Sequence, residues 1–146
     1  MTFKNPTDLE IKKLLQDVRV FAIVGASPKI DRPSYSVMSF LLSKGYRVVP
    51  INPTLSQSEI LGQKVYSCIG EVSPPVDVAD YFRSSSAVLQ DVQVALQAKE
   101  RLRLKCLWMQ KGVINEEAAE IAQEAGLQVI MDRCPKIEYL RLLEES

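Results

Sequence analysis

Residues 19–34 read RVFAIVGASPKIDRPS, and this stretch decides the fold. The apolar run over residues 19–24 stops at Gly25, which is typical of a strand buried on both faces in a parallel sheet. Pro33 and Ser34 then open a helix, and Gly45 ends it. The stretch therefore predicts a buried strand, a long loop and a crossover helix.

The same alternation of strands and helices continues outward from this unit. Apolar runs predict strands at residues 47–51, 76–82, 105–109 and 127–131, with a short candidate strand at 64–67 in an otherwise irregular stretch. Periodic apolar positions predict helices at residues 7–17, 87–99, 116–125 and 137–143. Such spacing requires crossover connections, which place helices on both faces of a parallel sheet. We expect a doubly wound α/β fold, with a mainly parallel five-stranded sheet in one Rossmann-like, three-layer domain over residues 1–146.

Charge and composition exclude several classes of function. Eighteen Lys and Arg balance eighteen Asp and Glu, so the chain lacks the overall charge of a nucleic-acid binder or a polybasic membrane binder. It has no histidine, which excludes His-based triads, His general bases and His-containing zinc sites. The expected partner is therefore a small molecule, bound in a local basic pocket, and no metal site is expected.

The cysteines and apolar runs indicate the compartment. Cys68, Cys106 and Cys134 lie too far apart for a CxxC motif, and their odd number favours a reducing environment. The amino terminus lacks the apolar core of a signal peptide, and no apolar run approaches the length that spans a bilayer. We expect a soluble cytoplasmic protein that does not enter membranes.

Ligands of open parallel sheets bind beyond the carboxyl ends of the strands, which here means the loops at residues 25–32, 52–54, 82–86 and 110–112. In the first loop, backbone N–H groups and the helix start can bind a phosphate, helped by the hydroxyls of Ser27 and Ser34 and the charges of Lys29 and Arg32. The loop carries the first glycine of a GxGxxG fingerprint and not the others. An ordinary connection without a ligand is therefore the alternative.

The other loops narrow the choice of ligand. NAD-binding domains place an acidic residue after the second strand, and Asn52 stands there, which favours coenzyme A (CoA) or NADP over NAD. Asn-Pro is also a good turn in its own right. Arg83 is placed for a phosphate or an adenine face, or is a solvated loop arginine. Gln110 can orient a ligand through its amide, whereas Trp108 lies inside a strand and is expected in the core.

Four of these segments together resemble a known family. VGASPKIDRPSYSVMSFLLSKGYRVVPINP, DYFR, LWMQKGVINEEAA and MDRCPKIEY are similar to the small stand-alone CoA-binding proteins, relatives of the CoA-binding domain of the succinyl-CoA synthetase alpha subunit. The likeness spans roughly residues 12–143. The contacts it implies are Gly25, Ala26 and Ser27 with the CoA pyrophosphate, supported by Arg32 and Ser34; Asn52 and Pro53 on the adenosine side; Phe82, Arg83 and Ser84 around the adenine; and Gln110 toward the pantetheine arm.

The resemblance implies no established reaction, because the catalytic histidine of the synthetase lies in a part of that enzyme without a counterpart here. Relatives often carry Lys directly after Asn-Pro, where this chain has Thr54, so no residue is assigned to the 3′-phosphate. We expect a CoA-binding protein without catalysis. The alternatives are an NADP-dependent reductase or an acyl-CoA transforming enzyme using Asp132, Cys134 or Tyr35, and a regulatory subunit that presents CoA to an unidentified protein partner.

Residues 132–135, DRCP, follow the last strand at the same edge of the sheet. The guanidinium of Arg133 beside Cys134 would favour the thiolate, and CoA ends in a thiol, so a mixed disulfide is one interpretation. The alternative is a turn in which Asp132 pairs with Arg133 while Cys134 packs as a small apolar side chain. Asp77 and Asp80 are expected to make structural contacts, and Cys68 and Cys106 to be spacer and core residues.

Overall fold

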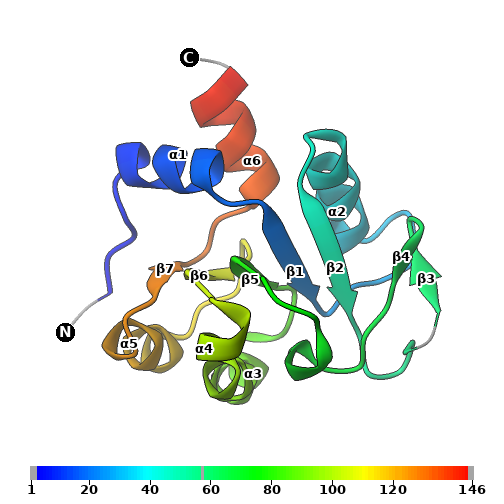
Figure 1. Cartoon of the computed structure of the whole chain (residues 1–146). Helices are drawn as coiled ribbons and strands as arrows, with labels where there is room; N and C mark the ends of the chain where they lie inside the picture. Colours follow the sequence, from blue (N-terminus) through cyan, green and yellow to red (C-terminus); the bar gives the residue numbers. More distant parts are fainter. Residues whose placement is uncertain (1–2, 57, 145–146) are drawn as a thin grey trace.

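The computed structural model describes residues 3–56 and 58–144, so the two residues at each end of the predicted domain and Gln57 lie outside it. Its centre is a five-stranded sheet in the order β2-β1-β5-β6-β7 (Figure 1). Every neighbouring pair in this sheet is parallel, which confirms the predicted doubly wound α/β fold. The strands are β1 (Val20–Val24), β2 (Arg47–Ile51), β5 (Val78–Tyr81), β6 (Cys106–Met109) and β7 (Gln128–Ile130).

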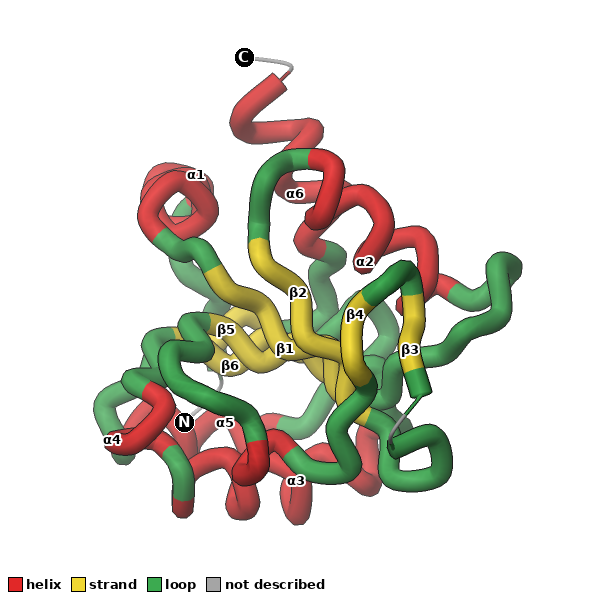
Figure 2. Tube along the Cα trace, turned by 45° about the vertical axis from the view of Figure 1, so that its right-hand side comes forward, coloured by secondary structure: helices red, strands yellow, loops and turns green. Residues whose placement is uncertain are grey.

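Helices cover both faces of the sheet (Figure 2). One face carries α1 (Asp8–Asp17), α2 (Pro33–Ser43) and α6 (Pro135–Tyr139), which continues as a wider turn over Leu140–Glu144; the other carries α3 (Ser85–Gln97), α4 (Lys99–Leu102) and α5 (Glu116–Glu124). Side chains of β1 alternate between the two cores: Phe21 and Ile23 pack on the first face and Ala22 on the second. This alternation explains why the strand is apolar at consecutive positions.

Local capping signals place several helix ends. The α1 capping box is present, with the Thr7 N–H donating to Glu10 Oε1 at 2.9 Å and the Glu10 N–H to Thr7 Oγ1 at 3.2 Å. The predicted starts of two other helices were wrong by two residues. The helix expected at 87–99 begins at Ser85, and the one expected at 137–143 begins at Pro135, because a proline fits the first helical position.

The outer strands of the sheet are both bonded to irregular segments. Beside β2, a hairpin of β3 (Glu59–Ile60) and β4 (Gln63–Lys64) leads to Tyr66, whose N–H donates to Pro50 O at 3.0 Å. The short strand expected at 64–67 is thus shorter and displaced, ending in a single bridge to β2. Beside β7, the amide of Asn5 donates to Met131 O at 2.9 Å and accepts from Met131 N–H at 2.7 Å.

Among the described residues, no helix combines the length and apolar character needed to cross a membrane.

Candidate functional site

The strand order places a topological switch point between β1 and β5, where the chain turns from building one half of the sheet to building the other. The loops at the carboxyl ends of the strands surround a cavity of about 870 Å³ there. Cavities of this size hold cofactor-sized ligands. A smaller cavity of about 290 Å³ adjoins it, and the two share Gly25, Asn52 and Arg83.

The structure brings most of the predicted contact residues together. Those that line the larger cavity are Gly25, Ala26, Ser27, Arg32, Ser34, Asn52, Phe82, Arg83 and Gln110. Pro53 lines the smaller cavity, and Ser84, the residue before α3, lines neither. Segments far apart in the sequence therefore converge on one space, as the strand-end rule predicts.

Gly25 is required by the approach of β1 to β5. Its φ of +89° lies in the left-handed region, and a Cβ at this position would lie 2.4 Å from the carbonyl oxygen of Phe82. Any side chain there would collide with backbone. The glycine of the incomplete fingerprint thus serves the packing of two strand ends, and it leaves room for Phe82 at the cavity wall.

The N–H groups expected to meet a phosphate already have partners within the chain. Those of Gly25 and Ala26 both donate to Ile51 O, at 3.0 and 3.1 Å, and that of Ser27 donates to Ser34 Oγ at 3.1 Å. The Ser34 N–H, in the first turn of α2, has no acceptor among the described residues. A phosphate at this loop would therefore meet the Ser34 N–H and the side chains of the loop.

Asn52 holds the first loop against the end of β2. Its Nδ2 donates to Ala26 O at 2.8 Å, and its Oδ1 accepts from the Thr54 N–H at 2.9 Å and from Thr54 Oγ1 at 2.8 Å. Every polar atom of this side chain is engaged with the protein. Asn52 therefore shapes the cavity, and its oxygen is not placed to receive a ribose hydroxyl.

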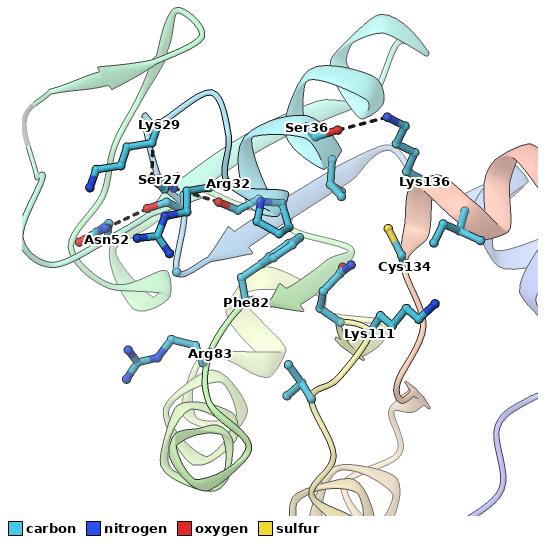
Figure 3. A pocket seen from close by; sticks show the side chains of 18 residues that line it. Ser27, Lys29, Arg32, Ser36, Asn52, Phe82, Arg83, Lys111, Cys134 and Lys136 are labelled. Carbon is cyan, nitrogen blue, oxygen red and sulfur yellow. Dashed lines mark hydrogen bonds between the residues drawn. The ribbon is translucent and has the colours of Figure 1, made fainter.

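Positive charge dominates the larger cavity (Figure 3). The described residues that line it include no Asp or Glu, and the basic ones are Lys29, Arg32, Arg83, Lys111 and Lys136. The charge is local, because the whole chain has a formal net charge of zero. Sequence reasoning missed Lys111 and Lys136, although each lies within two residues of a position it had singled out, Gln110 and Cys134.

Two of these cations have partners of their own. Arg83 Nε donates to Asp91 Oδ2 at 2.9 Å, which neutralises part of its charge, and Lys136 Nζ donates to Ser36 Oγ at 3.1 Å, which tethers α6 to α2. Lys29, Arg32 and Lys111 form no ion pair among the described residues. The cavity can thus receive a polyanion without first breaking salt bridges at these three positions.

Gln110 marks the end of the cavity nearest β6. The residue is 8% exposed, and its Oε1 has no hydrogen-bond partner among the residues that the structure describes. The lining of the same cavity also includes the apolar residues Val37, Val113 and Ile137. An unpartnered buried amide oxygen costs free energy unless a ligand donor reaches it.

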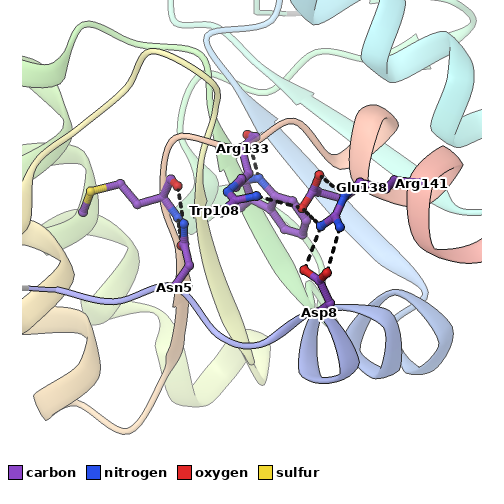
Figure 4. Close-up of polar contacts among 7 residues, drawn as sticks. Asn5, Asp8, Trp108, Arg133, Glu138 and Arg141 are labelled. Carbon is purple, nitrogen blue, oxygen red and sulfur yellow. Dashed lines mark hydrogen bonds and ion pairs between the residues drawn. The ribbon is translucent and has the colours of Figure 1, made fainter.

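The loop between β7 and α6 is held by several polar contacts (Figure 4). Trp108 Nε1 donates to Arg133 O at 2.9 Å, and Trp108 is fully buried, which confirms its place in the core. The expected pairing of Asp132 with Arg133 was wrong: Asp132 Oδ1 accepts from the Gly112 N–H at 2.7 Å, while Arg133 contacts Glu138 at 3.5 Å.

The buried Glu138 explains why the arginine turns away from Asp132. Glu138 is 2% exposed and contacts Arg141 at 2.8 Å, and Arg141 binds Asp8 through two further bonds of 2.8 Å. The hydrogen bond from Arg141 lowers the pKa of the Asp8 carboxyl. These contacts hold α6 against α1 and fix the direction in which the loop approaches the cavity.

The two aspartates flanking β5 differ. Asp77 Oδ2 accepts from the N–H groups of Arg19 at 2.8 Å and Val20 at 3.0 Å, so the expected structural role is confirmed. For Asp80 the expectation was wrong: it is fully buried, and neither carboxyl oxygen has a hydrogen-bond partner in the part of the chain that the structure describes. Burial raises the pKa of Asp80 well above its usual range, because desolvation disfavours the charged form of the carboxyl group.

Comparison with known proteins gives consistent matches over most of the chain. A family model described as the CoA binding domain matches residues 19–140. An uncharacterized protein of Bacillus subtilis (strain 168), YneT, is 35% identical over 136 residues, which is 93% of this chain and 96% of YneT. A solved structure of a hypothetical protein from Pyrococcus horikoshii OT3 is 35% identical, with a TM-score of 0.87 and coverage of 98% of this chain and 99% of that one.

A larger protein contains a similar unit. The dinucleotide-forming acetyl-coenzyme A synthetase 1 of Ca. Korarchaeum cryptofilum is 26% identical, with a TM-score of 0.64, over 77% of this chain and 25% of the synthetase. The match to a quarter of an acetyl-coenzyme A synthetase agrees with the resemblance to the CoA-binding domain of succinyl-CoA synthetase. Since the family model covers residues 19–140 and the convergent strand-end loops lie within that span, the chain belongs to the CoA-binding domain family.

Proposed function

We propose that this chain, acting as one unit over residues 1–146, binds CoA in the larger cavity and catalyses no reaction of its own. The observation that carries the proposal is the charge of the cavity: of the residues 3–56 and 58–144, five with basic side chains and none with a carboxylate line it, in a chain of zero net charge. CoA brings a pyrophosphate and a 3′-phosphate, and a cluster of cations in a concave site favours such a polyanion.

The placement of the ligand follows the order of the strands. The pyrophosphate would lie at the first loop, near Ser27, Arg32 and the free Ser34 N–H. The adenosine side would lie toward the Asn52-Pro53 turn, with Phe82 and Arg83 at the adenine. The pantetheine arm would run past β6, where Gln110 Oε1 awaits an N–H donor. The pantetheine arm contains two amide groups that can supply one.

CoA is favoured over NAD by the end of β2. No acidic residue stands there, and the Asn52 oxygen already accepts two bonds from Thr54. A dinucleotide with an unmodified adenosine ribose therefore lacks its usual acceptor. A binding role is favoured over an acid–base reaction because the carboxylate of Asp132, beside the site, is engaged with the Gly112 N–H.

Calorimetry with CoA, NADP and NAD at matched concentrations tests the proposal. We expect CoA to bind most tightly, and Arg32→Ala to weaken CoA binding about tenfold or more, since a charge-assisted phosphate contact contributes roughly 1.5 to 3 kcal/mol. Lys13→Ala is the matched control, because Lys13 is an exposed cation on α1 outside both cavities. Tighter binding of NADP or NAD, or an equal loss in both variants, would contradict the assignment.

A further inference from the structure

The three cysteines occupy different environments. Cys106 is fully buried in β6, where desolvation raises the pKa of its thiol far above the usual range. Cys68 is half-buried beside the smaller cavity and accepts from the Gly70 N–H at 3.4 Å. Cys134 is 7% exposed, yet its side chain lines the larger cavity (Figure 3). One thiol of three therefore faces the proposed CoA site.

Cys134 stands at the far end of that cavity from Asn52. Asn52 follows β2 and Cys134 lies between β7 and α6, and these two strands form opposite edges of the sheet. The loop at residues 25–32, where the pyrophosphate is proposed to bind and which is called the phosphate loop below, follows β1. In the sheet, β1 lies three strands from β7. Neighbouring strands lie about 4.8 Å apart, so roughly 14 Å separates the phosphate loop from Cys134 along the strand ends.

The pantetheine arm of CoA has the length needed to cover that separation. Its chain from phosphate to sulfur has as many bonds as about four extended residues, which span roughly 14 Å. The arm would pass β6 on its way, where Gln110 lines the cavity, is more than nine-tenths buried and has an amide oxygen with no hydrogen-bond partner among the described residues. This second, independent feature points to a ligand between the phosphate loop and Cys134.

We propose that Cys134 forms a mixed disulfide with the sulfur of CoA bound in the larger cavity, with CoA disulfide as the oxidant. The inference rests on the proposed CoA binding and adds a covalent, reversible form of it. The site would then discriminate between the reduced and oxidised forms of its own ligand.

The step is a thiol–disulfide exchange and balances without another reactant. The Cys134 thiol loses its proton to solvent, and the thiolate attacks the nearer sulfur of CoA disulfide. A new sulfur–sulfur bond forms, the bond of CoA disulfide breaks, and the released CoA thiolate takes up a proton. Cys134 is oxidised and the departing CoA is reduced. A low-molecular-weight thiol reverses the step by the same exchange.

The surroundings of Cys134 favour this oxidant over smaller disulfides. Lys111 and Lys136 line the cavity with Cys134, so an anionic disulfide is attracted where a neutral one is not. Arg133, by contrast, is held by Glu138 at 3.5 Å and does not account for the selectivity. Binding of one CoA half before exchange raises the local concentration of the sulfur at Cys134.

Intact-mass spectrometry of the full chain after incubation with CoA disulfide tests the inference. We expect the wild type and Cys68→Ser to gain the mass of one CoA less two hydrogens, and dithiothreitol to remove it. Peptide mapping of the wild type should place the modification on Cys134. This measurement does not depend on whether any variant folds. Cys134→Ser, checked for folding by circular dichroism, should gain no CoA. Reaction with CoA disulfide should be at least tenfold faster than with the neutral hydroxyethyl disulfide.

Calorimetry with reduced CoA in the presence of dithiothreitol distinguishes a failure of the disulfide inference from a failure of the proposed CoA binding. If the wild type binds reduced CoA and forms no adduct, or if mapping places the adduct on Cys68, the disulfide inference is overturned while CoA binding stands. Equal rates with both disulfides would also overturn it. If reduced CoA does not bind at all, the proposed function itself fails.

Discussion

The charged side chains at the two ends of the sheet differ in whether they are paired within the chain. At the amino ends of the strands, the Asp77 carboxylate accepts two backbone N–H bonds and lies 3.5 Å from Lys105 Nζ, so the charge is satisfied within the chain. At the carboxyl ends, Arg32 and Lys111 face a cavity without an ion pair among the described residues. The charge at the amino ends is thus paired within the chain, whereas the cations at the carboxyl ends line the cavity that we propose as the CoA site.

Removing the satisfied charge should give the largest effect on folding. Asp77→Ala leaves the N–H groups of Arg19 and Val20 without their acceptor beside a buried strand. We expect a loss of about 2 to 4 kcal/mol in the free energy of unfolding, measured by urea denaturation. CoA affinity of the folded variant should stay within about twofold of wild type, since Asp77 lies at the end away from the cavity. A parallel loss of affinity would break the separation between the two ends.

Asp80 belongs to neither pattern and provides a test by pH. Because its pKa is raised in the folded protein, the folded state keeps a proton that the unfolded chain releases above about pH 4. The stabilising effect of this proton is complete below the unfolded pKa and declines as pH rises toward the folded one. We expect the free energy of unfolding to fall by about 1.4 kcal/mol per pH unit from this group within that window.

Asp80→Asn should abolish that slope, because the amide cannot ionise. Urea denaturation at a series of pH values from about 4 upward measures it, and Asp17→Asn, at an exposed carboxyl on α1, should keep the wild-type slope. An unchanged slope in Asp80→Asn would show that the buried acid is not what makes stability depend on pH.

The smallest effect on stability is expected at the carboxyl end. Gln110→Met removes an amide oxygen that has no partner, so the free energy of unfolding should change by less than about 1 kcal/mol. CoA affinity should fall about two- to tenfold, the value of one neutral hydrogen bond. Gln128→Met, at the opposite end of the neighbouring strand β7, is the control and should alter neither quantity. Unaltered affinity in Gln110→Met would remove Gln110 from the ligand contacts.

The fold could be predicted from sequence where the pattern is long. The apolar run before Gly25 and the proline after it define β1 and the start of α2, because burial on both faces and the fixed φ of proline leave little choice. The β3–β4 hairpin could not be predicted, since strands of two residues carry no periodicity. Its position depends on the bridge from Tyr66 to β2, which is a tertiary contact.

The candidate site was predictable in position and less so in its bonds. The rule that ligands bind beyond the carboxyl ends of the strands locates the loops. It does not predict that the Gly25 and Ala26 N–H groups donate to Ile51 O, because these hydrogen bonds depend on the register of β1 against β2. Lys136 was missed because it lies before the predicted helix start at residue 137, although it belongs to α6 in the structure, and a single charged residue carries no signal of the direction in which its side chain points. Its approach to Ser36 follows from how α6 packs beside α2, a hundred residues away in the chain.

The bonds at the two outer strands bear on how this protein behaves when crowded. An exposed edge strand has a row of unpaired N–H and C=O groups. A strand of another molecule can form hydrogen bonds with these groups, and repeated pairing of this kind leads to aggregation. Here the Tyr66 N–H donates a hydrogen bond to Pro50 O in β2. The Asn5 side chain forms hydrogen bonds with both the backbone N–H and the backbone C=O of Met131, just beyond β7. Proline at position 50 also removes one N–H from the outer strand. The irregular segments at Tyr66 and Asn5 thus occupy hydrogen-bonding groups at the two edges of the sheet, which makes it harder for a strand of another molecule to add there.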